Sequence, residues 1–475
     1  MRKTNLNGHS APGVYSKESS VPYGILKPSW ELYGRGSKSS KAKVIDGSDY
    51  YSKLYLTFEI LSAGTVVWEY WGEDNTNVKT IYYSINKGEW IDMTPTVQYD
   101  EEEGQYIGTT VIELSVGDTI RFKGDNNAYG DADGVFGNGF SEDGSAVFNI
   151  YGNIMSLIDS VDFVSASTVY DASFMNLFSG TKVVNASNLI LPATELEVSC
   201  YSYMFYGCAS LVSAPELPAT SLADYCYEGM FNGCTSLVNA PVLPATELAG
   251  SCYNIMFNGC TRLVNAPALP ATTLANNCYS SMFVGCTSLV NAPELPATTL
   301  KGDCYSYMFQ GCSNLVNAPA LPATELVDSC YSGMFNGCTS LVNAPVLPAT
   351  ELAGYCYSGM FRGCTSLVNA PVLPATELVD SCYLYMFQGC TSLVNAPALP
   401  ATELAGNCYS HMFRGCSNLN YIKAMFTTKP STTYTNNWVQ GVAENGTFVK
   451  NSAATWDVRG VNGVPNGWTV QTALS

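Results

Sequence analysis

Residues 269–294 read LPATTLANNCYSSMFVGCTSLVNAPE. Closely similar units of the same length follow one another through the middle of the chain and begin at Leu191, Leu217, Leu243, Leu269, Leu295, Leu321, Leu347, Leu373 and Leu399. A fixed period in this range is typical of stacked units, each of which covers the apolar face of its neighbour. The sequence therefore predicts a repeat solenoid, a fold that more often binds than catalyses.

The middle of the unit predicts a short helix in every coil. Asn, Asp, Ser or Gly residues precede the first cysteine and suit a helix N-cap, and Gly285 suits the left-handed residue that ends a helix. At about 100° per residue, Cys278, Tyr279, Met282 and Phe283 share one arc and are expected in the core. The residues from Cys286 to Pro293 are expected to form the strand side. The expected fold class is an α+β solenoid with a short helix plus strands in each coil.

Four segments are expected along the chain. Residues 1–45 are an extended basic arm, 46–155 a β-sandwich, 156–420 the solenoid with an imperfect cap repeat at 156–190, and 421–475 a β cap. In the second segment, runs rich in β-branched and aromatic residues predict strands at Leu54–Ile60, Val66–Tyr70, Thr80–Ile85, Gln105–Leu114, Thr119–Lys123 and Ala146–Tyr151. In the cap, strands are expected at Gly446–Lys450 and Gly467–Thr472.

Charge is unevenly distributed along the chain. The net charge is −18, which argues against nucleic-acid binding and against an anionic membrane surface. Residues 1–43 hold eight Lys or Arg and two Glu, a charge of +6, so the remainder carries −24. Such an arm suggests docking onto an acidic partner, with candidate anchoring residues Arg2, Lys3, Lys17, Lys27 and Arg35. The alternative is a solvated tail. We expect no signal peptide, because the first residues lack an apolar region, and no membrane insertion.

All 18 cysteines lie in the repeats, two per unit, with seven residues between them. Cysteines at the same position of adjacent coils would lie about 5 Å apart, which permits disulfides, although nine in a ladder leave one unpaired. A thiol buried as a small apolar group explains the pattern without pairing. The spacing is not that of a zinc site, and no metal or cofactor is expected.

Candidate binding residues occupy the positions that vary between repeats. The residue before Met and the residue after Phe change from unit to unit, and the best candidates for a recognition surface are Tyr203, Tyr206, Tyr307, Arg362, Tyr385, His411 and Arg414. The alternative is drift at solvated positions. A ladder of asparagines, including Asn291 and Asn317, could bind glycan or could pair along the stack. The segment Asp125–Gly134 has oxygen ligands for calcium but lacks the EF-hand spacing, so a glycine-rich turn is expected.

Catalysis has little support in the sequence. His9 and His411 are the only histidines, and no nucleophile–base pattern, phosphate loop or metal cluster is present. Glycosidases need a pair of carboxylates, and nothing singles out two among the acidic residues. We therefore expect a protein that is not an enzyme.

The repeat resembles the BspA-like, Treponema-type leucine-rich repeats, best in the run Met-Phe-x-Gly-Cys-x-x-Leu. Tyr151–Ile158 and the segment Tyr421–Phe426 also resemble the flanking motifs of surface proteins of gut Bacteroidales. The resemblance covers about residues 50–475 and implies a leucine-rich-repeat fold with a surface or adhesion role and no chemistry. Phages of such bacteria carry similar modules, which makes a virion protein possible.

The sequence thus predicts a structural or adhesion protein. The first choice is a phage fibre or capsid decoration located on the virion, anchored by its arm and binding a host surface glycan or protein through the repeats. The alternative is a bacterial cell-surface adhesin. A homo-oligomer is compatible with either.

Overall fold

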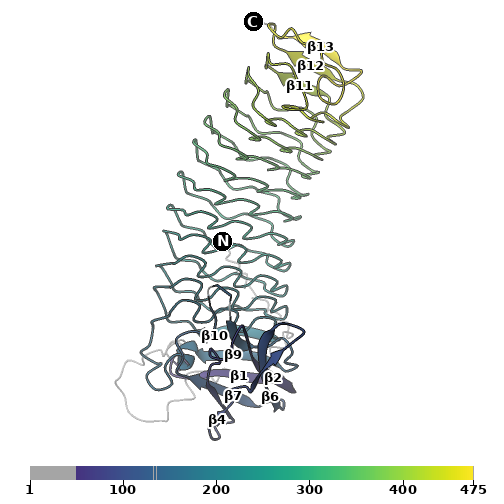
Figure 1. The fold of residues 1–475 in the computed structure, drawn as a ribbon. Helices are drawn as coiled ribbons and strands as arrows, with labels where there is room; N and C mark the ends of the chain where they lie inside the picture. The colour runs from purple at the N-terminus through teal and green to yellow at the C-terminus, as the bar shows by residue number, and fades with distance from the viewer. Residues whose placement is uncertain (1–49, 132, 135, 474–475) are drawn as a thin grey trace, which may run out of the picture. The chain divides into compact units, whose positions relative to one another are not determined.

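The amino-terminal part of the structure is built from strands. The computed structural model describes residues 50–131, 133–134 and 136–473. Ten of the described strands precede the repeats: β1 (Leu56–Ser62), β2 (Gly64–Gly72), β3 (Ile81–Ile85), β4 (Ile91–Asp92), β5 (Val97–Asp100), β6 (Gln105–Leu114), β7 (Thr119–Gly124), β8 (Phe136–Phe140), β9 (Val147–Asn153) and β10 (Val183–Ile190). They form a six-stranded sheet in the order β10-β9-β1-β7-β3-β4 and a four-stranded sheet in the order β5-β6-β2-β8 (Figure 1).

Alternation of apolar and polar residues explains how the two sheets pack. In β7 every second residue is buried, as expected of a strand with one face on a core. Phe58 of β1 stacks on Phe148 with ring centroids 4.4 Å apart, and it contacts Phe140 of the other sheet at 4.8 Å. Phe140 in turn stacks on Phe178 at 5.5 Å. The core of the sheets therefore continues without a break into the repeats.

The repeats, each 26 residues long, stack on one another and are joined by backbone hydrogen bonds. Figure 1 shows them as successive coils. Two aromatic ladders run through the stack. Tyrosines from Tyr201 to Tyr409 lie with ring centroids 5.7–6.0 Å apart, and phenylalanines from Phe205 to Phe413 lie 5.6–5.8 Å apart. All of them are buried. Each ring has neighbours on both faces, so every coil depends on the coils above and below it.

The prediction of an α+β solenoid with a short helix in each coil is wrong. Among the described residues the only helix is a single 3-10 turn, η1 (Ile154–Leu157), which lies outside the repeats. The segment Cys278–Val284, predicted to be helical, consists of successive turns. The described elements are otherwise strands, isolated bridges and turns.

The hydrogen bonds show why no helix forms. Alternate N–H groups donate within the coil, as Met282 N does to Tyr279 O at 3.3 Å. The groups between them donate to the next coil, as Ser281 N does to Ser306 O at 2.8 Å. Every fourth residue also has a positive φ: Asn277 (56°), Ser281 (56°) and Gly285 (70°). A left-handed residue every four positions interrupts any helix, while the bonds to the next coil replace the helical ones.

The cysteines are free thiols buried in the stack, as predicted. In the second cysteine position of most repeats the thiol donates to the phenylalanine carbonyl of the preceding coil, as Cys312 does to Phe283 O at 3.1 Å. Burial raises the pKa of Cys312 and Cys304 to about 12. These thiols therefore remain protonated at neutral pH and act as small apolar groups.

Removal of one tyrosine hydroxyl from the ladder should not destabilise the protein. The hydroxyl of Tyr253 is buried and has no hydrogen-bond partner among the described residues. Burial of an unpaired hydroxyl costs about 1–3 kcal/mol, so we expect Tyr253→Phe to be neutral or stabilising by about 1 kcal/mol. The control is Tyr129→Phe, because the buried Tyr129 hydroxyl donates to Leu157 O at 2.7 Å and its loss should destabilise. Denaturant unfolding of both variants checks this, and an equal loss in both would contradict it.

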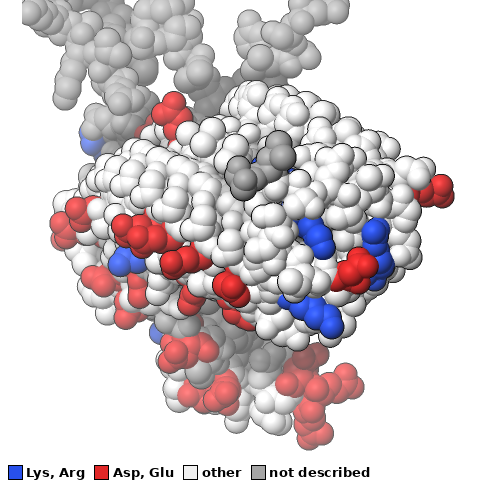
Figure 2. Space-filling view, turned by 90° about the horizontal axis from the view of Figure 1, so that it is seen from above, with Lys and Arg blue, Asp and Glu red and all other residues white. Residues whose placement is uncertain are grey.

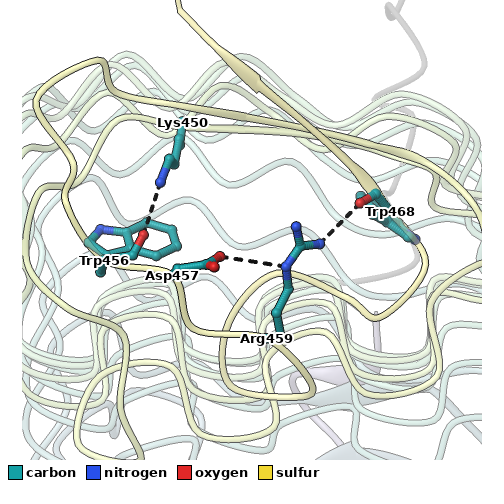
Figure 3. A network of polar contacts seen from close by, with 5 residues as sticks. All are labelled: Lys450, Trp456, Asp457, Arg459 and Trp468. Atoms are coloured by element: carbon teal, nitrogen blue, oxygen red, sulfur yellow. Dashed lines mark hydrogen bonds and ion pairs between the residues drawn. The ribbon is translucent and has the colours of Figure 1, made fainter.

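A parallel sheet and a polar network close the carboxyl-terminal end. The strands β11 (Tyr421–Ala424), β12 (Thr447–Lys450) and β13 (Thr469–Thr472) pair in that order. Trp438 covers the last coil, with its ring 6.0 Å from Phe413. In Figure 3 Lys450 donates to Trp456 O at 2.9 Å, and Arg459 donates to Trp468 O at 3.1 Å. These bonds hold the loop that connects β12 to β13.

Candidate functional site

The turns of each coil present the variable residues on the outside of the stack. The residue before Met occupies the left-handed region in every repeat, including Tyr203 (54°), Tyr307 (55°), Tyr385 (58°) and His411 (57°). The Tyr, Met and Phe side chains on either side of this residue point into the core and are buried. The rigid core therefore fixes the backbone position of each of these residues. The side chain itself lies outside the core, so its type can differ between repeats.

Three consecutive repeats bring four of the predicted site residues together. The Arg362 guanidinium lies 5.8 Å from the centre of the Tyr385 ring, and the Tyr385 and His411 rings lie 4.7 Å apart at 30°. The Arg414 backbone N–H donates to His411 O at 3.1 Å, and the Gln388 backbone N–H donates to Tyr385 O at 3.0 Å. We call Arg362, Tyr385, Gln388, His411 and Arg414 the Arg–Tyr–His cluster.

The cluster has unused hydrogen-bonding and charge capacity. Gln388 Oε1 and His411 Nδ1 are buried without a hydrogen-bond partner among the described residues. Burial, and then the positive charge of Arg414, lower the pKa of His411, so its imidazole is neutral at neutral pH. Both arginines are exposed, and within the described part of the chain neither forms an ion pair. Two unpaired guanidinium groups beside polar atoms are suited to a carboxylate or sulfate.

The other predicted site residues lie elsewhere on the stack. Tyr203 and Tyr206 pack edge to face at 5.8 Å in the first repeat. Tyr307 stands apart in a middle repeat, where its ring covers Gly333. The anchoring residues Arg2, Lys3, Lys17, Lys27 and Arg35 lie outside the described residues. Sequence reasoning did not select Gln388, although it occupies the variable position after Phe, because a neutral amide is not distinctive until its neighbours are known.

Two alternatives were predicted for the asparagine ladder, glycan binding and pairing along the stack, and the structure shows pairing for part of the ladder. Successive asparagines form parallel bridges along the stack, and Asn317 Nδ2 donates to Asn291 Oδ1 at 3.0 Å. In the segment predicted as a glycine-rich turn, Asp125 accepts from the Ser160 backbone N–H at 2.7 Å. Among the described residues no group of three His, Cys, Asp or Glu is placed to hold a metal ion.

A family model for BspA type leucine rich repeat regions matches six copies, over residues 168–289, 250–368 and 354–435. The chain belongs to the BspA type leucine-rich-repeat family. The match covers more than half of the 475 residues and includes every residue of the Arg–Tyr–His cluster. The comparisons with curated proteins and with solved structures find no match. The family assignment rests on the repeats, and it confirms the resemblance inferred from Met-Phe-x-Gly-Cys-x-x-Leu.

Surface charge in this BspA type chain is sparse. Figure 2 shows acidic side chains in groups and large areas without any charge, in keeping with a chain in which 13% of residues are charged. Within residues 50–131, 133–134 and 136–473, the structure contains no helix of the length and apolar character that membrane crossing requires.

Substitution of two glycines, Gly333 and Gly359, tests whether an outer side chain packs against the residue at the same position of the next repeat. Gly333 and Gly359 have nearly the same φ, 60° and 59°. A Cβ on Gly333 would lie 2.3 Å from the Tyr307 ring, whereas a Cβ on Gly359 would meet nothing within 4 Å. We expect Gly359→Ala to cost about 1–2 kcal/mol of stability from the left-handed backbone alone. Gly333→Ala should cost that amount and also displace the Tyr307 ring, which NMR of the Tyr307 side chain would detect. An unchanged Tyr307 environment in Gly333→Ala would contradict the packing.

Proposed function

We propose that this protein is a non-enzymatic adhesion protein that binds a carboxylated or sulfated surface glycan at the Arg–Tyr–His cluster. The observation that carries the proposal is the convergence of Arg362, Tyr385, His411 and Arg414 from three repeats with constant cores. Family membership supports a surface or structural role for the repeats. An array of this kind offers an ordered, extended surface, and variation at its outer positions sets specificity without disturbing the fold.

The chemistry of the cluster favours anionic ligands. The exposed guanidinium groups supply bidentate donors, and the Tyr385 ring supplies a flat apolar surface beside them. The His411 ring, which lies 4.7 Å from the Tyr385 ring, extends this flat surface toward Arg414. A neutral sugar would leave both arginines without a partner, which is the basis of discrimination.

Loss of the two arginines should abolish most of the binding. Hydrogen bonds to charged groups contribute about 1.5–3 kcal/mol each, so we expect Arg362→Ala/Arg414→Ala to weaken binding to immobilised sulfated or uronate glycans by about 100-fold or more. The matched control is Arg262→Ala, which removes one positive charge from an exposed position of another repeat. It should change the affinity less than about twofold. Equal losses in the double variant and the control would show nonspecific charge attraction and contradict the proposal.

The place of display is a further part of the proposal. Proteins of the BspA type are typically found on cell surfaces or outside the cell. The +6 charge of residues 1–43 favours attachment to an acidic capsid or tail protein, and we assign the protein to a virion on that basis. The alternative is a bacterial cell-surface adhesin.

Mass spectrometry of purified virions and of host envelope fractions tests this assignment. We expect peptides from residues 1–45 in intact virions, in constant ratio to the capsid protein. Detection only in the envelope fraction would contradict virion display and support the bacterial adhesin. The binding experiment is independent of this outcome, because it concerns the repeats alone.

A further inference from the structure

A pocket of about 260 Å³ lies where β2 and β8 meet the first coils of the stack. Its lining includes Glu69 and Trp71 of β2, Glu142 from the loop after β8, and Asn176, Ser179 and Tyr206 from the coils. None of these residues belongs to the Arg–Tyr–His cluster. The pocket and the cluster therefore offer different chemistry at different places in the same chain.

The strand register explains why the pocket exists. Glu69 lies opposite Gly139 and Trp71 opposite Gly137 in the antiparallel pair of β2 and β8. Both glycines lie on the strand face that would otherwise carry side chains, so β8 provides a floor of bare backbone. The Trp71 indole lies across Gly137, where a Cβ would be 2.6 Å from the ring. A side chain at Gly137 would displace the indole and reshape the pocket.

The polar groups of the pocket are acidic or neutral. Glu69 is partly buried and accepts a hydrogen bond from Ser141, and its pKa is raised by burial despite that bond. Glu142 is exposed, and its negative charge and that of Asp143 raise the pKa of Glu69 further. Asn176, Ser179 and the Tyr206 hydroxyl add neutral donors and acceptors. Two carboxylates repel an anionic ligand, while an indole face and several acceptors suit the C–H face and hydroxyls of a sugar ring.

We infer that this pocket binds one residue of a neutral sugar. Trp71 provides the stacking surface, Glu69 and Glu142 accept from hydroxyl groups, and Tyr206 closes the side formed by the repeats. The volume is slightly below the ~300–1,000 Å³ of pockets for drug-sized ligands, which fits a single ring. The inference goes beyond the proposed function, since it concerns a second site with the opposite charge preference.

Titration of the full chain by saturation-transfer NMR tests the inference with four probes: methyl α-mannoside, methyl β-galactoside, methyl N-acetyl-β-glucosaminide and methyl β-glucuronide. We expect at least one neutral glycoside to bind with a Kd of about 1 mM and the glucuronide to bind at least about tenfold more weakly. Trp71→Ala and Glu69→Gln should each weaken the neutral sugar about tenfold or more. Tyr206→Ala, at a side chain that is 46% exposed, provides a variant with little risk to folding.

The variants separate this site from the cluster. Arg362→Ala/Arg414→Ala should leave binding of the neutral sugar within about twofold, so the two sites can fail independently. The inference is overturned if none of the neutral glycosides binds, if the glucuronide binds as well as they do, or if Glu69→Gln and Tyr206→Ala both retain full affinity.

Discussion

Raising the pH to about 10 should unfold the repeats. All 18 cysteines are buried as free thiols, and burial raises the pKa of many of them, such as Cys304 and Cys364, to about 12. The tyrosine ladder behaves in the same way, since burial raises the pKa of Tyr279 well above its ordinary value. In an unfolded chain a cysteine thiol titrates near pH 9. The unfolded state therefore releases protons at a pH where the folded state retains them.

The sign of the effect follows from this difference. Well below pH 9, at about pH 7, both states keep the thiols protonated, and the stabilisation due to burial is fully present. Between about pH 9 and 12 only the unfolded state ionises, so stability falls by about 1.4 kcal/mol per pH unit for each thiol. If all 18 thiols act together, the slope approaches about 24 kcal/mol per pH unit. Ordinary domain stabilities of about 5–15 kcal/mol would be lost within one unit.

Circular dichroism and thiolate absorbance, followed together from pH 7 to 12 under reducing conditions, measure this effect. We expect both signals to change together near pH 10. A protein without buried thiols, followed over the same pH range, serves as the control for unfolding or chemical damage caused by alkaline pH alone. Thiolate absorbance that rises gradually around pH 9 while the fold persists would contradict the burial of the cysteines.

The error in the predicted helix has a specific physical origin. Cys278, Met282 and Cys286 recur at intervals of four, and over eight residues this spacing cannot be distinguished from a helical period of 3.6. The distinguishing signal lay at the residues between them. Asn277, Ser281 and Gly285 also recur every four, and the middle position is Gly in three other repeats (Gly229, Gly333 and Gly359). Small and left-handed-tolerant residues at that spacing indicate successive turns.

Strand prediction succeeded for the longer runs of β-branched and aromatic residues and missed β4, β5, β8 and β10. Runs such as Gln105–Leu114 and Thr119–Lys123 form β6 and β7 with nearly the predicted bounds. The strand β8 was missed, because Phe136-Gly-Asn-Gly-Phe140 has turn-like composition. With β8 the pocket beside Trp71 was missed as well. Its signal was present as bulky residues on β2 facing alternate glycines, but only the register shows that the two strands are neighbours.

The grouping of the candidate residues was only partly predictable for a related reason. Variation at the outer positions selected Arg362, Tyr385, His411 and Arg414 as candidates, and their role stays a prediction. Their proximity could not be read from the sequence, because residues 23 and 26 positions apart come together only if the coils stack in register. The same variation also selected Tyr307, which has no partner among the predicted site residues. Periodicity identifies the exposed positions. Whether the residues at these positions form a cluster depends on which side chains occupy adjacent coils.

Truncation of one ring in the middle of the stack should have the largest effect of any single substitution. Phe309 is fully buried and stacks on Phe283 at 5.6 Å and on Phe335 at 5.8 Å. Removal of a buried phenylalanine costs about 3–5 kcal/mol, and here contacts on both faces are lost together. We expect Phe309→Ala to lower the free energy of unfolding by that amount. The control is Val316→Ala in the same repeat, at a side chain that is 42% exposed, with an effect below about 0.5 kcal/mol.

The location of the damage distinguishes a stack of coupled coils from a single cooperative core. Because each coil contacts only its neighbours, hydrogen exchange in Phe309→Ala should accelerate in the coils on either side of Phe309 and fall off toward both ends. Phe413→Ala, next to Trp438, should affect the last coils and the adjacent parallel sheet, since the interface on one side is with the cap. Equal acceleration over the whole chain in both variants would show that the repeats unfold as one unit. Loss of glycan binding by Phe309→Ala would then be expected. In a coupled stack binding should be retained, because the Arg–Tyr–His cluster begins two coils away at Arg362 and keeps its geometry until the intervening coils open.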